Sequence, residues 1–243
     1  MENKAKIKDY SIFLLLTTLV LVLLIVLIHI DTKAIKTIDN FMFGWIHSLR
    51  CEPLNVIMFG LSILSSPEFI IVLMIILLCL PSRKKVGIPC AFMTVIGIII
   101  GYALKFLIAR TRPVGVLATS SIVNISLPSS YSFPSGHSLL SLVFCFVFLY
   151  TLLSYKNKNK NFSYFAVLFS VLIGFSRIYL GVHYFTDVLA GWLLATIIIF
   201  LYMLLEKTGF FKNYFFLTKE RKNIEKSVEG TNANSGKNEK EKN

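Results

Sequence analysis

Long apolar stretches, separated by short polar segments, dominate the sequence. A helix that crosses a bilayer needs roughly 20 apolar residues, because it must span about 30 Å of hydrocarbon. Four stretches reach this length: 11–30, 86–108, 136–155 and 183–205. Residues 162–175 are a shorter continuous apolar run, and 67–81 extend backwards through 53–65 as a helix broken at Ser65-Ser66-Pro67. The pattern predicts an all-α, integral membrane six-helix bundle.

The composition supports a membrane protein. The chain has 243 residues, of which 55% are hydrophobic and 16% are charged, whereas a soluble domain carries about 25% charged residues. This argues against an ordinary soluble globule and rules out a disordered chain. The net charge of +12 would suit nucleic acid, but the basic residues flank the apolar stretches, so we expect a lipid bilayer and no nucleic acid as partner. The four cysteines are too few and too scattered for a disulfide scaffold.

The basic residues also predict the orientation, because cytoplasmic loops carry an excess of Lys and Arg. They precede the first span, follow the second and fourth, and recur in the tail. Those outside the tail are Lys4, Lys6, Lys8, Arg83, Lys84, Lys85, Lys156, Lys158 and Lys160. Six spans place all these regions on one side, so both termini are expected in the cytoplasm and the membrane is expected to be a bacterial plasma membrane.

This topology divides the chain into three parts. We expect a cytoplasmic N-terminus over 1–10, a membrane domain over 11–205 and a basic, largely disordered cytoplasmic tail over 206–243. A signal peptide is the alternative for the first apolar stretch. That stretch is longer than a usual signal sequence and no clear small-x-small cleavage site follows, so an uncleaved span is expected.

A few ionisable residues remain when the flanks, the tail and the first outer loop are set aside. Asp39 and Glu68 are counted with that loop. The remainder are the cations Lys105, Arg110, Arg112 and Arg177, the acid Asp187, and the span-end histidines His137 and His183. Ionisable residues at the edge of a bilayer are functional candidates. Four cations beside one carboxylate repel one another unless an anion lies among them, and a phosphate group has the matching charge and oxygens.

The first two segments that carry these residues favour anion binding. Lys105 ends an apolar helix, Arg112 follows seven residues on, on the same face if the helix continues, and Pro113 turns the chain. In the second segment, Gly136 permits close backbone approach, and free amides at a helix N-terminus bind anions. Taken alone, each segment also fits a structural role, as snorkelling cations or as a capped helix start beside His137.

The third segment favours nucleophilic chemistry. His183 and Asp187 are spaced i, i+4, so a carboxylate on one helix face reaches one ring nitrogen and leaves the other nitrogen free to attack. Arg177 precedes the turn at Gly181 and reaches the same anion. A purely structural His–Asp pair is the alternative.

Together the three segments resemble a known signature. The pattern K-x6-RP, PSGH and SR-x5-H-x3-D, at Lys105 to Pro113, Pro134 to His137 and Ser176 to Asp187, is similar to that of the type 2 phosphatidic acid phosphatase (PAP2) superfamily. The resemblance runs from about residue 50 to 205, and the run SRIYLGVHYFTDVLAG resembles bacterial type B phosphatidylglycerophosphate phosphatases. It implies a six-helix bundle with a PAP2/acid-phosphatase-like core.

The resemblance also implies roles for the residues. His183 is expected to attack phosphorus and form a phosphohistidine, Asp187 to orient it, and His137 to act first as general acid and then as base. The expected phosphate ligands are Lys105, Arg112, Ser135, Gly136 and Arg177. We expect no metal and no other cofactor, because the sequence shows no HExxH motif or carboxylate cluster. Arg110 lies outside the signature and is expected to touch a lipid head group or lipid phosphate.

The expected activity is metal-independent hydrolysis of a membrane lipid phosphomonoester, phosphatidylglycerophosphate or phosphatidate, at the extracytoplasmic face. Undecaprenyl pyrophosphate is the alternative substrate. A transporter of anionic lipids or ions would need ionisable residues or broken helices near the midplane, and a vanadate-dependent haloperoxidase is typically soluble. The preferred lipid, the oligomeric state, the role of the tail and the state of Cys51 are left open by the sequence.

Overall fold

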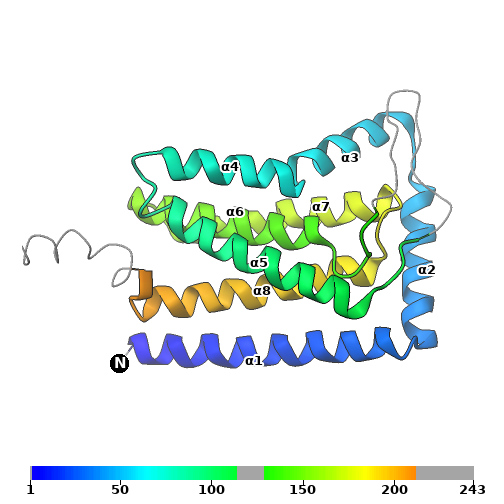
Figure 1. Cartoon of the computed structure of the whole chain (residues 1–243), viewed down its shortest axis with the longest axis horizontal. Helices are drawn as coiled ribbons and strands as arrows, with labels where there is room; N and C mark the ends of the chain where they lie inside the picture. Colours follow the sequence, from blue (N-terminus) through cyan, green and yellow to red (C-terminus); the bar gives the residue numbers. More distant parts are fainter. Residues whose placement is uncertain (1, 114–128, 212–243) are drawn as a thin grey trace, which may run out of the picture. The chain divides into compact units, whose positions relative to one another are not determined.

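The computed structural model describes residues 2–113 and 129–211 (Figure 1). The helices of this part are α1 (Glu2–His29), α2 (Lys33–Ser48), α3 (Glu52–Leu64), α4 (Pro67–Cys79), α5 (Gly87–Ile108), α6 (Gly136–Tyr155), the 3-10 helix η1 (Lys160–Tyr164), α7 (Phe165–Tyr179) and α8 (Phe185–Lys207). The chain divides into two compact units, Met1–Met203 and Leu204–Asn243. The first unit contains the candidate site.

The all-α membrane fold is confirmed, with five helices that could cross a membrane and a sixth candidate in a bent pair. The helices α1, α5, α6, α8 and the continuous pair η1–α7 are each long and apolar enough to cross a membrane. The pair α3–α4, which is bent by 46°, is a sixth candidate when it is counted as one broken span. The break falls at the predicted place, because Ser65 caps the C-terminus of α3 and the Ser66 hydroxyl accepts a hydrogen bond from the Phe69 amide at 3.1 Å.

Two helical segments were not predicted from the sequence. Helix α1 begins at Glu2, so the described part of the predicted cytoplasmic N-terminus continues the first span as helix. The first outer loop contains a further helix, α2, which runs across one end of the bundle, roughly perpendicular to α1 and α8 (Figure 1). Its buried residues Ile35, Asp39 and Ile46 form one stripe. The predicted disordered tail lies largely in residues 212–243, outside the described part.

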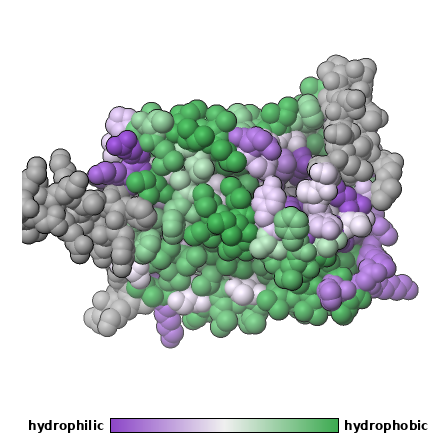
Figure 2. Space-filling view, viewed as in Figure 1, coloured by the Kyte–Doolittle hydropathy of each residue, from purple (hydrophilic) through white to green (hydrophobic). Residues whose placement is uncertain are grey.

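The surface is that of a multi-pass membrane protein. Figure 2 shows hydrophobic side chains over the middle of the visible face and most of the strongly hydrophilic side chains toward its ends. On α1, large hydrophobic side chains are exposed, among them Phe13, Leu15 and Leu19. An apolar surface of this extent needs lipid to cover it.

Close helix packing fixes the start of α6. A Cβ added at Gly191 of α8 would lie 2.7 Å from the carbonyl oxygen of Ser135, which is the N-cap of α6. A Cβ at Gly101 of α5 would lie 2.9 Å from Leu139 Cδ2. Gly191 therefore lets α8 approach α6 more closely than a larger residue would, and Gly101 leaves room for the Leu139 side chain.

We expect Gly191→Ala to destabilise the protein, because the added methyl group meets a backbone oxygen that cannot swing away. Overpacking of this kind costs about 1–3 kcal/mol. Thermal unfolding in detergent should show a lower Tm than for the wild type. Gly44→Ala in α2 is the matched control, since a Cβ there meets nothing within 4 Å. An equal Tm for both variants would show that the contact between α6 and α8 is looser than described.

Candidate active site

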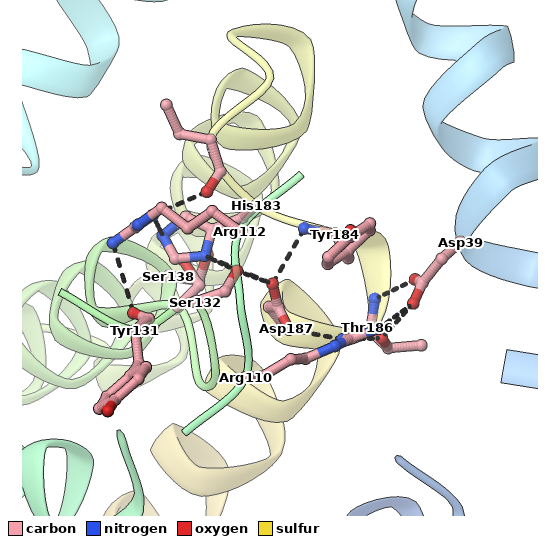
Figure 3. Close-up of polar contacts among 12 residues, drawn as sticks. Asp39, Arg110, Arg112, Tyr131, Ser132, Ser138, His183, Tyr184, Thr186 and Asp187 are labelled. Atoms are coloured by element: carbon pink, nitrogen blue, oxygen red, sulfur yellow. Dashed lines mark hydrogen bonds and ion pairs between the residues drawn. The ribbon is translucent and has the colours of Figure 1, made fainter. Parts of the chain in front are cut away.

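Three loops meet at one end of the helical unit and build the candidate site. They are residues 109–113 after α5, residues 129–135 before α6, and residues 180–184 between α7 and α8. Figure 3 shows side chains from all three loops pointing toward one another around His183 and Asp187.

A cavity of about 240 Å³ lies at this meeting point. Six of the eight predicted site residues line it: Lys105, Arg112, Gly136, His137, Arg177 and His183. The other two, Ser135 and Asp187, are fully buried next to residues of this wall. The structure therefore brings the predicted residues together. The rest of the wall is largely apolar and includes Ile98, Leu139 and Leu140.

The first segment reaches the cavity by a route that the sequence pattern did not predict. Helix α5 ends at Ile108, and Ala109 takes a left-handed conformation (φ 48°) while its amide bonds Lys105 O at 2.9 Å. The helix does not continue to Arg112, so the condition for a shared helix face of Lys105 and Arg112 is not met. The Lys105 ammonium donates to Tyr131 O at 2.7 Å, and Arg112 Nη1 donates to Val182 O at 2.7 Å.

The second segment presents the N-terminus of α6 to the cavity. Ser135 is extended (φ −69°, ψ 109°) and Gly136 is the first helical residue. The Ser135 amide donates to the backbone carbonyl of Asp187 at 3.0 Å, which ties the start of α6 to α8. The first amides of a helix have no partner within the helix and point outward, so this end favours an anion.

In the third segment, His183 precedes α8 rather than lying on it. Gly181 takes a positive φ of 80°, which turns the chain from α7 toward the cavity. His183 Nδ1 faces Asp187 Oδ2 in the first turn of α8, at 3.6 Å. The expectation of one shared helix face is wrong, although the predicted pairing of an imidazole with a carboxylate is present at a distance longer than a hydrogen bond.

The carboxylate of Asp187 is held by three donors. Its Oδ2 accepts a short hydrogen bond from the Ser132 hydroxyl and a bond of 2.9 Å from the Tyr184 amide. Its Oδ1 accepts from Arg110 Nη1 at 2.6 Å. Because both oxygens are bound, the carboxylate cannot rotate freely, and the edge that faces His183 is fixed.

The other ring nitrogen of His183 faces Arg112. The Nη1 atom of Arg112 lies 3.2 Å from Nε2, which favours a neutral ring with its proton on Nδ1 and a lone pair on Nε2. Burial lowers the pKa of His183 to about 3, the nearby Asp187 carboxylate opposes this, and the Arg112 charge lowers the pKa further. The ring is therefore neutral at physiological pH, and a neutral imidazole has a lone pair that can act as a nucleophile.

Arg177 completes the cationic wall from α7. It is buried and donates from Nη1 to the Ser62 hydroxyl of α3. Among the described residues, its Nε has no hydrogen-bond partner. A buried guanidinium beside a cavity, with one N–H left over, is suited to an anion in that cavity.

Sequence reasoning misplaced three charged residues. Arg110 does not face a lipid head group, because it bridges Asp187 and Asp39. Asp39 is buried rather than part of the loop's surface charge, and its place in the apolar stripe of α2 was the available signal. Glu68 lies at the break between α3 and α4 and lines the cavity. For Glu68 the signal was its position directly after the break at Pro67.

The arrangement defines a class: a helical membrane protein with a buried imidazole and three cations around one cavity. The chain belongs to the PAP2 superfamily, whose pattern matches residues 87–210, and this confirms the family and the PAP2-type core expected from the sequence.

Curated relatives and a solved structure agree with this membership. The chain is 31% identical to the undecaprenyl-diphosphatase of Sulfolobus acidocaldarius, over 78% of this chain and 91% of that protein. It is 32% identical to phosphatidylglycerophosphatase B of Bacillus subtilis, over 76% of this chain and 91% of that protein. The crystal structure of a transmembrane PAP2 type phosphatidylglycerolphosphate phosphatase from Bacillus subtilis superposes with a TM-score of 0.71 at 28% identity, covering 80% of this chain and 96% of that one.

We expect the His183 ring to stay neutral from pH 8 to pH 5 in the protein without substrate, because its pKa lies near 3. Replacing Arg112 with Gln removes a nearby cation that disfavours the protonated ring, so the pKa of His183 should rise in that variant. Nitrogen-15 NMR of ring-labelled histidine measures both effects. A wild-type ring that gains its proton near pH 6.5 would contradict the described burial.

Proposed function

We propose that this protein is a lipid phosphatase that hydrolyses a membrane phosphomonoester, phosphatidylglycerophosphate or phosphatidate, through a phosphohistidine intermediate. The observation that carries the proposal is the single cavity that joins His183, His137 and three cations to an apolar wall. A phosphate group fits the cationic end, and the first carbons of a lipid fit the apolar side.

His183 Nε2 attacks phosphorus in the first step. The new N–P bond forms as the bond from phosphorus to the lipid oxygen breaks, and His137 gives its proton to that oxygen. The lipid leaves as an alcohol. In the second step His137 takes a proton from water, the water oxygen attacks phosphorus, and the N–P bond breaks to release inorganic phosphate. Asp187 stabilises the positive ring charge that develops on His183.

Lys105, Arg112 and Arg177 neutralise the phosphate oxygens during both steps. Phosphoryl transfer depends mostly on positioning and on charge stabilisation in a site with little water. Three cations and the amide of Gly136, with Ser135 beside it, supply both. We therefore propose that catalysis requires no metal ion.

The charge distribution supports an orientation with the site outside the cytoplasm. The Arg83, Lys84 and Lys85 cluster between α4 and α5 lies at the end of the bundle opposite α2, and the site lies at the α2 end (Figure 1). With the positive end in the cytoplasm, residues 1–10 and 206–243 are cytoplasmic, and residues 11–205 form the phosphatase domain.

A second substrate class has a specific observation in its favour. One relative matched over most of both chains is an undecaprenyl-diphosphatase. The same chemistry cleaves a diphosphate, because His183 then attacks the terminal phosphorus and the leaving group is a lipid phosphate. Undecaprenyl pyrophosphate is therefore the alternative substrate.

We expect the purified protein to release phosphate from lipid phosphates in excess EDTA, and His183→Ala to lower kcat by at least about a thousandfold, as loss of a nucleophile does. His29→Ala is the matched control, since His29 is exposed and outside the site. Phosphate release from phosphatidylglycerophosphate, phosphatidate and undecaprenyl pyrophosphate identifies the preferred lipid. Activity that needs added divalent metal, or that survives in His183→Ala, would refute the mechanism.

A further inference from the structure

A buried carboxylate lies behind the candidate site, on an element that the mechanism does not use. Asp39 of α2 is 2% exposed. Its Oδ1 accepts from the Thr186 amide at 2.9 Å, and its Oδ2 accepts from the Thr186 hydroxyl at 2.8 Å. A buried carboxylate is costly unless it is paired and hydrogen-bonded. The contacts of Asp39 with the start of α8 meet part of this requirement.

Arg110 supplies the charged partner that the buried Asp39 carboxylate still needs, and it connects Asp39 to the site. Its Nη2 donates to Asp39 Oδ2 at 2.7 Å, and its Nη1 donates to Asp187 Oδ1 at 2.6 Å (Figure 3). Its guanidinium also lies over the Tyr184 ring, 4.4 Å from the centroid. Burial lowers the pKa of Arg110, but Asp187 and Asp39 outweigh burial and raise that pKa above its ordinary value. The bridge is therefore permanently charged.

The bridge holds one of the two oxygens of the Asp187 carboxylate, while Ser132 and the Tyr184 amide hold the other. With Oδ1 held by Arg110, the other oxygen, Oδ2, faces His183 Nδ1. Arg110 itself comes from a loop segment after α5, so its position depends on its side-chain contacts, which on the α8 side include the Thr186 hydroxyl at 2.8 Å. Asp39 is the partner that fixes the far side of the guanidinium. Without it, one N–H group of Arg110 would lose its acceptor and the guanidinium could turn away from Asp187.

We propose that Asp39 is a positioning residue for the phosphatase reaction: through Arg110 it holds Asp187 in the orientation that keeps the His183 proton on Nδ1 and the lone pair on Nε2. The inference rests on the proposed function for its effect on turnover. Its effect on the His183 tautomer is independent of the substrate.

The kinetic test compares Asp39→Asn, Arg110→Gln and the double variant with the wild type. Asp39→Asn should lower kcat by about tenfold to a hundredfold, the usual effect of losing a partner that orients a catalytic group, and should leave KM within about twofold. The double variant should be no slower than Arg110→Gln, because both changes break one bridge. Asp39→Glu, which keeps the charge, should recover part of the loss.

Asp31→Asn is the matched control. Asp31 lies in the turn between α1 and α2, pairs with Lys36, and has a side chain that is 67% exposed. It should behave as the wild type. Three results would each overturn the inference. They are equal kcat values for Asp39→Asn and Asp31→Asn, additive losses in the double variant, and a rise in KM at constant kcat.

A second measurement separates this inference from the proposed function. Nitrogen-15 NMR of the His183 ring should show the Nδ1–H tautomer in the wild type and in Asp31→Asn, and a mixture of tautomers in Asp39→Asn. The tautomer result is expected even if the protein hydrolyses no lipid phosphate in the panel. Such a lack of hydrolysis would refute the proposed function but not this inference. If Asp39→Asn does not fold in detergent, Arg110→Lys is measured instead. An unchanged tautomer in the folded variant would overturn the inference.

Discussion

The burial of one carboxylate organises the end of the bundle at which the site lies. Asp187 has no exposed surface, so its charge must be met by protein groups rather than by water. Arg110 follows α5, Ser132 precedes α6, and the Tyr184 amide precedes α8, and all three donate to this carboxylate. Three segments that are distant in the sequence are thereby drawn to one point. Arg112, His137 and His183 are carried to the cavity by those same segments.

Bilayer thickness explains why the sequence predicted the spans so well. One length scale applies to every helix that crosses the membrane, so apolar runs of the right length are informative even without periodicity. The break at Ser65-Ser66-Pro67 was readable because a proline and two capping hydroxyls all favour a new helix start there. Within the outer loop no such length constraint acts, and the crosswise helix α2 was accordingly missed.

The spacing of residues in the sequence identified the site residues, but it did not predict how they are arranged in space. The seven-residue interval from Lys105 to Arg112 would give one helix face only in a continuous helix, whereas α5 ends three residues after Lys105 and the chain turns at Ala109. Pro113 disfavours helix only at the residue before it, so this earlier stop is not readable from local preference. Asp39 was missed for a different reason. It was counted with the charges of the first outer loop, and every acid of that loop was taken to be solvated. Its burial depends on Arg110 and Thr186, which are far away in the sequence.

The carbonyl contacts of the cations have a consequence for the reaction cycle. Lys105 donates to Tyr131 O, and Arg112 donates to Val182 O and Ser130 O. The main chain thus acts as an internal competitor for any phosphate that enters, and a bound oxyanion must displace these oxygens. In the proposed cycle, this exchange weakens the binding of an incoming phosphate group, and it equally weakens the binding of free phosphate after hydrolysis. If these residues bind phosphate as proposed, the same exchange would help the product phosphate to leave the pocket.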